Sequence, residues 1–344
     1  MSDGARGEPA MDDRQPPSRP AEISVIVVNY GIADLAAAAV QSVLEREHGG
    51  RAVDIHLVDN ASPGADRETL SARAREASWR DRVTFYPEEA NHGFGRGNNL
   101  VLSALAAREI PPRYVFLLNP DARLENEVLD ILAGVLDATP EAGFAGAGIS
   151  KPESGPVAAA FRFPGFISEF TQTLGLGPVF RLFGQWQVAL PPDHPHGPVG
   201  WVSGAAMMAR FSVLEELGSF DPAFFLYYEE TDLMRRAAKK GWQTWYVPAA
   251  RVIHAEGVAT GVRSSDTLHP PRPAYWYQSW AHYFHHSKGR WGAAILGSCV
   301  LLAAGLHLIQ RRLRGKPAML PGNFLSDFWR NAARPLLAGR SPLA

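Results

Sequence analysis

Four short apolar runs alternate with stretches of helical character in the first third of the chain. The runs cover residues 23–28, 53–58, 83–86 and 114–118, and the first of them reads ISVIVV. Runs this rich in β-branched residues are typical of strands that are buried on both faces. The residues between them, 33–47, 66–78 and 98–108, favour helices. This alternation predicts an α/β fold with a doubly wound, mostly parallel sheet flanked by helices.

Three of the four predicted strands lead directly into polar clusters. These clusters are Asn29-Tyr30, Asp59-Asn60 and Asn119-Pro120-Asp121. In doubly wound sheets ligands bind beyond the carboxyl ends of the strands, so the clusters are expected to lie on one rim. Further along, residues 152–198 predict loops and short elements, 200–210 a strand, 229–240 a helix and 242–247 a strand.

Charge and cysteine content exclude several classes of protein. A formal net charge of −1 over 344 residues gives no indication of a nucleic-acid partner. The single cysteine, Cys299, rules out an internal disulfide framework and fits a reducing compartment. Residues 1–21 are rich in Gly, Pro and charge and carry no apolar run, so they predict a disordered tail rather than a secretory signal. The folded part is therefore expected in the cytoplasm.

Two carboxylates after the predicted strands are candidates for donor chemistry. Asp121, held in a turn by Pro120, is suited to binding a divalent cation that bridges two phosphates. Asp59 is suited to a hydrogen bond with a nucleobase or a ribose hydroxyl. Plain turn or capping roles account for the same two residues equally well when each is considered alone.

The glycine-rich segment 91–99 resembles a phosphate-binding loop that runs into a helix at Asn98. It matches neither the dinucleotide fingerprint, which follows the first strand, nor the P-loop pattern. A flexible glycine turn is the simpler interpretation.

An aromatic run, Phe224 to Tyr228, directly precedes Glu229, Glu230 and Asp232. Acidic residues at a helix start interact favourably with the helix dipole, which is a sufficient structural reason for them. The aromatic neighbours instead favour a sugar-binding wall with a general base, kept ionised by the dipole. His254 is expected in a short loop after the strand at 242–247, where it is either a metal or diphosphate contact or a surface loop histidine. His194, His196, His282, His285 and His286 are expected to be non-catalytic, and metal binding by them is not expected.

Taken in order, these segments resemble family 2 glycosyltransferases of the GT-A fold, in their bacterial rhamnosyltransferase-like branch. The resemblance runs from Ile23 to Gly257 and rests on seven segments. They are Val27-Val28-Asn29-Tyr30, Val58-Asp59-Asn60-Ala61-Ser62, Asn91-His92-Gly93-Phe94 with Asn98-Asn99, Leu118-Asn119-Pro120-Asp121, Gly218-Ser219-Phe220-Asp221, Glu229-Glu230-Thr231-Asp232-Leu233 with Arg236, and His254.

The resemblance implies roles for these residues. Asp59 contacts the base, Asp121 coordinates Mg²⁺ or Mn²⁺ with His254 as a further ligand, and Glu230 is the catalytic base, with Glu229 and Asp232 as alternatives. Asn119 stands where the metal-binding motif of the family has its first Asp, so it offers the metal no charge. The implied donor-binding set is Asn29, Tyr30, Asp59, Asn91, Gly93, Phe94, Asn98 and Asn119.

The implied activity is inverting transfer of a sugar from a nucleotide-diphosphate donor to a saccharide or lipid-linked acceptor in cell-surface polysaccharide synthesis. The best candidate donor is dTDP-rhamnose. Galactofuranosyl or other hexosyl transfer, and a non-catalytic nucleotide-sugar-binding protein, are the alternatives. A nucleotidyltransferase would need a Gly- and Lys/Arg-rich loop after the first strand, where this chain has Asn29-Tyr30-Gly31-Ile32.

The carboxyl-terminal segment carries an apolar stretch from Trp291 to Gln310 without a charged residue. It is near the minimum length for a membrane span, but basic residues flank both of its ends. A helix lying on the inner membrane is favoured over a span, and a span over a buried core helix. The expected organisation is a tail (1–21), a glycosyltransferase domain (22–262) and a helical, membrane-proximal extension (263–344).

Overall fold

The computed structural model describes residues 20–255 and 270–343. The boundary expected at 262/263, and all but the last two residues of the expected tail, lie outside these ranges.

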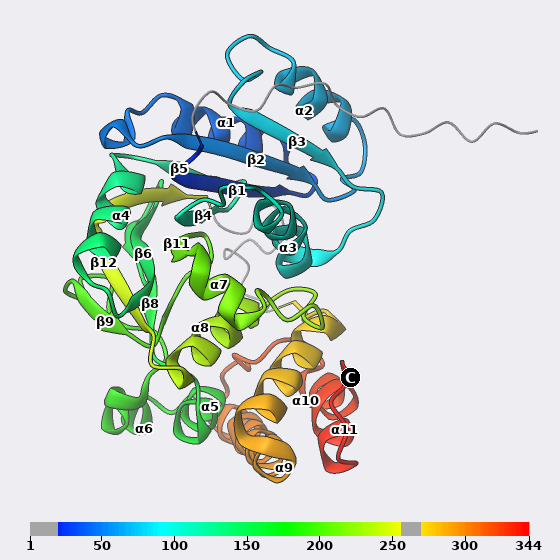
Figure 1. Cartoon of the computed structure of the whole chain (residues 1–344). Coiled ribbons are helices and arrows are strands. Elements are labelled where there is room, and N and C mark those ends of the chain that lie inside the picture. The colour runs from blue at the N-terminus through cyan, green and yellow to red at the C-terminus, as the bar shows by residue number, and fades with distance from the viewer. Residues whose placement is uncertain (1–19, 256–269, 344) are drawn as a thin grey trace, which may run out of the picture.

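One sheet of ten strands forms the centre of the molecule (Figure 1). Its strands are β1 (Ile23–Asn29), β2 (Val53–Asp59), β3 (Val83–Pro87), β4 (Tyr114–Leu118), β5 (Ala122–Leu124), β6 (Ala142–Lys151), β7 (Gly155–Val157), β9 (Gly197–Val199), β11 (Ala206–Arg210) and β12 (Gln243–His254). They lie in the order β3-β2-β1-β4-β11-β6-β12-β5, with β7 beside β6 and β9 beside β12. The first four strands are mutually parallel, as are β6 and β12, whereas β11 runs antiparallel between β4 and β6.

Helices cover both faces of this sheet. On one face lie α1 (Ala33–Leu44), α2 (Asp66–Ala74) and α4 (Val128–Ala138). On the other lie α3 (Gly93–Ala106), α7 (Phe211–Leu217) and α8 (Glu229–Lys239). Alternate residues of β1 enter opposite cores, Val25 and Val27 the first and Ile26 and Val28 the second. This two-sided burial accounts for the unbroken apolar run and confirms the predicted α/β class.

A third apolar cluster joins the C-terminal helices to the sheet domain. Figure 1 shows these helices beside α5 and α8. Helix α9 (Ala274–Leu313), kinked at Gly289, packs against α5 (Phe166–Leu174) and α11 (Arg334–Leu337). Phe224, from the loop before α8, is buried in this cluster with Trp280 and Phe328. The remaining elements are η1 (His48–Gly50), β8 (Ala160–Phe161), α6 (Gly177–Leu182), η2 (Gly184–Trp186), β10 (Trp201–Val202), α10 (Phe324–Phe328) and η3 (Trp329–Ala333).

Three local predictions are wrong. The glycine-rich segment is not a loop, because α3 already begins at Gly93. Its glycines serve close packing: a Cβ on Gly93 would overlap the carbonyl oxygen of Phe225, and one on Gly97 would lie 2.9 Å from Val28. The strand predicted over 200–210 is interrupted between β10 and β11. His254 ends β12 instead of lying in a loop, because irregular pairing between Val247 and Arg251 lets that strand continue.

Candidate active site

A cavity of about 710 Å³ opens beyond the carboxyl ends of β1 and β4. Tyr30 and Asn119, the residues that follow these strands, lie on its wall. Helices α3 and α8 contribute Phe94 and Glu230 from the other side. The rim predicted from the strand ends is therefore the edge of a cavity large enough for a small-molecule ligand.

Asp121 and His254 face each other across the floor of this cavity. The carboxylate oxygen Oδ1 of Asp121 lies 3.0 Å from Nε2 of His254, and the amide of Asn119 lies 3.2 Å from the same nitrogen. The sheet register brings about this contact, because β5 pairs antiparallel with β12 and sets Ala122 opposite His254. Residues 133 positions apart thus become neighbours.

The ligand atoms of Asp121, His254 and Asn119 are of types that bind divalent cations. A carboxylate and an imidazole are ligands that Mn²⁺ and related cations accept, and Asn119 offers an amide oxygen if its side chain is rotated. The open cavity in front of them leaves room for phosphate oxygens and water as the other ligands. The geometry is compatible with the metal hypothesis for Asp121 and His254.

Glu229 and Glu230 begin α8 and both line the cavity. The chain reaches them through Tyr227 and Tyr228, whose φ values are both +70°. Left-handed backbone in bulky residues costs about 1–3 kcal/mol per residue and is concentrated at functional sites. The two tyrosines turn the chain so that the first turn of α8 points into the cavity.

Burial raises the pKa of both glutamates above the usual range. For Glu229, repulsion from Glu230 raises the pKa further, whereas backbone N–H groups, including that of Gly204, lower the pKa of Glu230. One carboxylate oxygen of each has no hydrogen-bond partner among the described residues. Desolvation therefore opposes the helix dipole and raises the pKa of both groups, so the dipole alone does not set their ionisation.

A second cavity of about 390 Å³ adjoins the first, and Tyr227 and Glu230 line both. Its walls carry a stacked pair, Phe161 and Trp201, whose ring centroids are 4.1 Å apart, and Trp276. Apolar ring faces with a few polar groups are suited to binding the faces of sugar rings. Glu230 therefore stands between two cavities.

Two predicted donor-binding residues lie beneath the cavity instead of lining it. Asn29 and Asp59 are fully buried, and the Asn29 amide donates to Asp59 (3.2 Å), Ser62 (3.0 Å) and Asp66 (3.3 Å). Arg67 approaches Asp59 to 3.9 Å. In this structure the pair supports the loop after β2, and contact with a base requires Asp59 to become exposed.

Two further predicted residues have structural contacts. Asn98 is buried inside α3, where its amide donates to the Phe94 carbonyl. Asp232 is buried and accepts a 2.7 Å hydrogen bond from Arg236, which also donates to the carbonyls of Leu217 and Ser219. This arrangement joins α8 to the preceding loop, and Asp232 does not line the cavity.

The remaining predicted residues of this segment do reach the cavity. Asn91, Gly93 and Phe94 lie on its wall. The Asn91 side chain accepts a hydrogen bond from the Asn60 amide at 3.0 Å and another from the backbone of Gly93 at 2.9 Å. These contacts hold the start of α3 against the rim.

Comparisons with known proteins decide the family. A model described as "Glycosyltransferase like family 2" matches residues 20–267. The chain belongs to this family. The predicted recognition is thereby confirmed, and the match covers the whole sheet domain.

Curated relatives of this family 2 glycosyltransferase include rhamnosyltransferases. An N-acetylglucosaminyl-diphospho-decaprenol L-rhamnosyltransferase of Mycobacterium tuberculosis is 30% identical over 220 residues, which are 61% of this chain and 69% of the relative. Rhamnosyltransferase WbbL of Escherichia coli is 26% identical over 167 residues, which are 47% of this chain and 61% of that one. These relatives confirm the rhamnosyltransferase-like branch.

A solved structure confirms the fold of this family 2 member. The crystal structure of GalNAc-T7 with UDP, GalNAc and Mn²⁺ superposes with a TM-score of 0.58 at 15% identity. The likeness covers 93% of this chain and 58% of that chain. At this identity the likeness shows the GT-A fold alone.

Sequence reasoning missed several residues of this cavity in the family 2 member. Lys151 ends β6, Ser203 lies between β10 and β11, and Tyr275 belongs to α9. Lys151 lies just before the irregular segment, and Tyr275 lies beyond the last motif shared with the family. No sequence pattern around either residue therefore predicts a position in the cavity. The same reasoning set aside His282 and His286, which the structure brings together with Asp221.

Proposed function

We propose that this protein is an inverting glycosyltransferase that transfers a hexose from a nucleotide-diphosphate donor to a saccharide acceptor. The observation that carries the proposal is the position of Glu230 between two adjoining cavities, with Asp121 and His254 in the larger one. In this proposal Glu230 is the base, the larger cavity is the donor site and the smaller one is the acceptor site.

The larger cavity is the proposed donor site. Tyr30, Asn91 and Phe94 line the part nearest β1 and α3 and would bind the nucleotide and its diphosphate. Asp121 and His254, with Asn119 beside them, would hold Mg²⁺ or Mn²⁺. When bound, such a cation neutralises charge on the leaving diphosphate. Asp59 is proposed to contact the base after a local rearrangement that frees it from Asn29.

In the proposed reaction Glu230 removes the proton of an acceptor hydroxyl. The hydroxyl oxygen then bonds to the anomeric carbon while the bond from that carbon to the diphosphate breaks. The nucleoside diphosphate leaves, and the proton stays on Glu230. A single displacement from the opposite face inverts the anomeric configuration. The raised pKa of Glu230 suits this role because a base is most effective when its pKa is near the working pH.

The smaller cavity is the proposed acceptor site. The stacked Phe161 and Trp201 would bind one sugar face, and Tyr227 and Glu230 form the border with the donor site. An aromatic cavity of this size accommodates one or two saccharide units.

Rhamnose is the proposed sugar and dTDP-rhamnose the proposed donor, because two curated relatives are rhamnosyltransferases. Galactofuranose and other hexoses are the alternatives, since another relative is a hexosyltransferase of Haloferax volcanii, 26% identical over 237 residues. The relative from Mycobacterium tuberculosis also motivates a lipid-linked acceptor.

Transfer assays with a panel of nucleotide sugars, with and without Mn²⁺ or Mg²⁺, test this proposal. Glu230→Gln should lower transfer by about 10³-fold while leaving donor affinity within about threefold, because the amide cannot accept the proton. Glu215→Gln, on the exposed side of α7, is the matched control and should transfer normally. Full transfer by Glu230→Gln disproves the base assignment. Donor binding without any transfer identifies a non-catalytic binding protein.

Helix α9 is the proposed site of contact with the inner membrane, on its cytoplasmic face. By length and composition α9 is apolar enough to cross a membrane, and 44% of its most apolar window is buried inside the protein. The outward face carries a stripe of large apolar side chains: Trp291, Ile295, Leu302, Leu306, Ile309 and Leu313. Basic residues flank the stripe at both ends. One buried face and one apolar face favour a helix that lies on the membrane.

Sedimentation with vesicles containing phosphatidylglycerol tests this contact. Leu302→Glu with Ile309→Glu should release the protein into the supernatant, because two charges enter the apolar stripe. Ile110→Glu is the matched control, since Ile110 is 59% exposed, as is Ile309, but lies away from α9. Equal sedimentation of both variants disproves the proposed face.

A further inference from the structure

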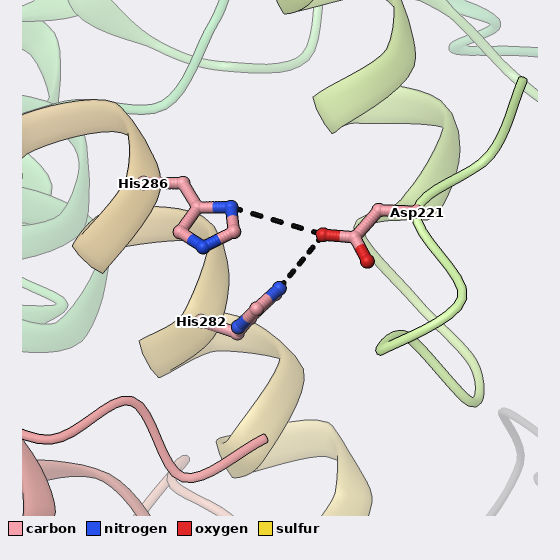
Figure 2. A group of neighbouring side chains, drawn as sticks. All are labelled: Asp221, His282 and His286. Carbon is pink, nitrogen blue, oxygen red and sulfur yellow. Dashed lines mark hydrogen bonds and ion pairs between the residues drawn. The ribbon is translucent and has the colours of Figure 1, made fainter. Parts of the chain in front are cut away.

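Three side chains outside both cavities converge where the loop before α8 meets α9 (Figure 2). Oδ2 of Asp221 lies 2.9 Å from Nε2 of His282 and 3.7 Å from Nδ1 of His286. The two imidazole rings have centroids 4.1 Å apart. Figure 2 shows both rings on one side of α9, turned toward the same carboxylate oxygen.

The spacing of the two histidines matches a metal-binding pair. His282 and His286 are four positions apart, so they lie one turn apart on the same face of α9. Two histidines with this spacing on a helix commonly bind Zn²⁺, and a carboxylate is an accepted third ligand. Asp221 supplies that carboxylate from 61 positions earlier in the chain.

Second contacts hold two of the three groups in orientation. The other oxygen of Asp221, Oδ1, accepts a 2.9 Å hydrogen bond from the backbone N–H of Ala223. Nδ1 of His282 lies 2.7 Å from Oγ of Ser341. When Nδ1 donates to Ser341, the lone pair of Nε2 points toward Asp221, as metal ligation requires. Such outer contacts are a regular feature of protein metal sites.

A plain Asp–His hydrogen-bonded pair accounts for only part of this arrangement. It covers the 2.9 Å contact of His282, but the 3.7 Å contact of His286 is too long for a hydrogen bond. Ligand atoms about 2.0–2.1 Å from a tetrahedral ion lie roughly 3.3 Å apart, and the two distances fall on either side of this value. His282 is 4% exposed and His286 46%, so the group has a rigid base and a solvent entrance.

We propose that Asp221, His282 and His286 form a binding site for a transition-metal dication of the Zn²⁺ class, with water as the fourth ligand. The site attaches the loop that carries Asp221 to helix α9. The same loop continues through Tyr227 and Tyr228 into Glu229. It is separate from the Asp121–His254 group and has a structural role.

Zn²⁺ binding by the untagged full-length protein tests the site. The protein is stripped with a chelating resin, and Zn²⁺ is titrated against a chromophoric chelator in excess Mg²⁺, which occupies oxygen-rich sites and competes weakly for imidazole. One Zn²⁺ per chain is expected at micromolar concentration or below. His286→Ala and Asp221→Asn should each weaken it at least tenfold. Co²⁺ should give the absorption of a tetrahedral site, lost in the same variants.

Two variants distinguish this site from binding at a neighbouring histidine or in the donor cavity. His285→Ala, which removes the adjacent histidine of α9, should bind Zn²⁺ as the unmodified protein does. His254→Ala should also retain the site, since it alters only the donor cavity. Absence of Zn²⁺ binding, unchanged binding by His286→Ala and Asp221→Asn when both are folded by circular dichroism, or loss confined to His254→Ala, overturns the proposal.

Discussion

Two Asp–His groups in this protein use the same side chains in different surroundings. Asp121 and His254 are brought together by strand pairing and face an open cavity. Asp221 and His282 are brought together by docking of α9 onto the sheet domain, and the ring of His282 packs against Phe224 at 4.8 Å. The first group faces a cavity with room for a substrate, whereas the second lies outside both cavities.

The difference shows that residue type does not decide the role of such a group. We expect a carboxylate and an imidazole at about 3 Å to serve substrate chemistry where they line a cavity, and attachment where they join two elements outside the cavities. Changes in the first group should therefore affect transfer, and changes in the second should affect stability.

The largest expected effect is that of Asp121→Asn on transfer. The variant should lose about 10³-fold in kcat, because one charged ligand near the leaving group disappears. Its free energy of unfolding should change by less than about 1 kcal/mol, since asparagine has nearly the same shape as aspartate and leaves no cavity. Steady-state assays and urea unfolding provide the two measurements. The comparison fails if Asp221→Asn reduces transfer as strongly as Asp121→Asn.

His282→Ala should show the opposite pattern. Loss of the hydrogen bonds to Asp221 and Ser341 and of the packing on Phe224 should lower the free energy of unfolding by about 3 kcal/mol. Urea unfolding in the presence of a chelator measures the protein part of this effect. His254→Ala, the corresponding change in the cavity, should cost less than about 1 kcal/mol. Equal losses in the two variants would contradict the contrast.

Glu169 should make the attachment of α9 depend on pH. Burial raises its pKa from 4.5 to about 7, although a hydrogen bond from Trp280 opposes the shift. The folded protein therefore holds this proton more tightly than the unfolded chain. Its contribution to stability is complete below pH 4.5 and is lost as the pH rises through about 7. The contribution is on the order of 2 kcal/mol, reduced from the full shift by residual solvent contact.

Thermal unfolding at pH 5 and pH 8 checks this effect. The unmodified protein should lose more stability between the two values than Glu169→Gln, whose side chain does not titrate. Parallel curves for the two proteins would show that Glu169 titrates normally in the folded state.

The smallest expected effect is a change in the pH dependence of transfer. Repulsion between Glu229 and Glu230 is mutual, so Glu229→Gln should lower the pKa of Glu230. The acid limb of the pH profile of kcat should move to lower pH, because Glu230 then loses its proton earlier. Glu215→Gln should leave the limb in place. A shift to higher pH would contradict the assigned direction.

The sequence predicted the parts of the fold that depend on local pattern. The four apolar runs became β1 to β4, and Tyr30, Asn119 and Asp121 at their ends lie around one cavity. This succeeded because parallel strands direct their carboxyl ends to one edge. The glycines of α3 were wrongly predicted to form a loop. Glycine occurs both in flexible loops and where elements pack closely, so the residue type alone does not distinguish the two.

Side-chain exposure could not be predicted from sequence position. Asp59 is the last residue of β2 and Asn60 is the next, but only Asn60 lines the cavity, whereas Asp59 is turned inward toward Asn29. Asp232 follows Glu230 by two positions and faces Arg236 instead of the cavity. A helix turns by about 100° per residue, so two acids that are two positions apart on α8 point in nearly opposite directions.

The sequence by itself determined the alternation of strands and helices and the identity of the residues at the strand ends. Those features depend on local burial patterns of a few residues. The tertiary structure decided that His254 lies beside Asp121, that Glu230 borders two cavities, and that His282 and His286 approach Asp221. The residues of each of these groups are far apart along the chain. Their proximity follows from sheet register and helix docking, which no short segment encodes alone.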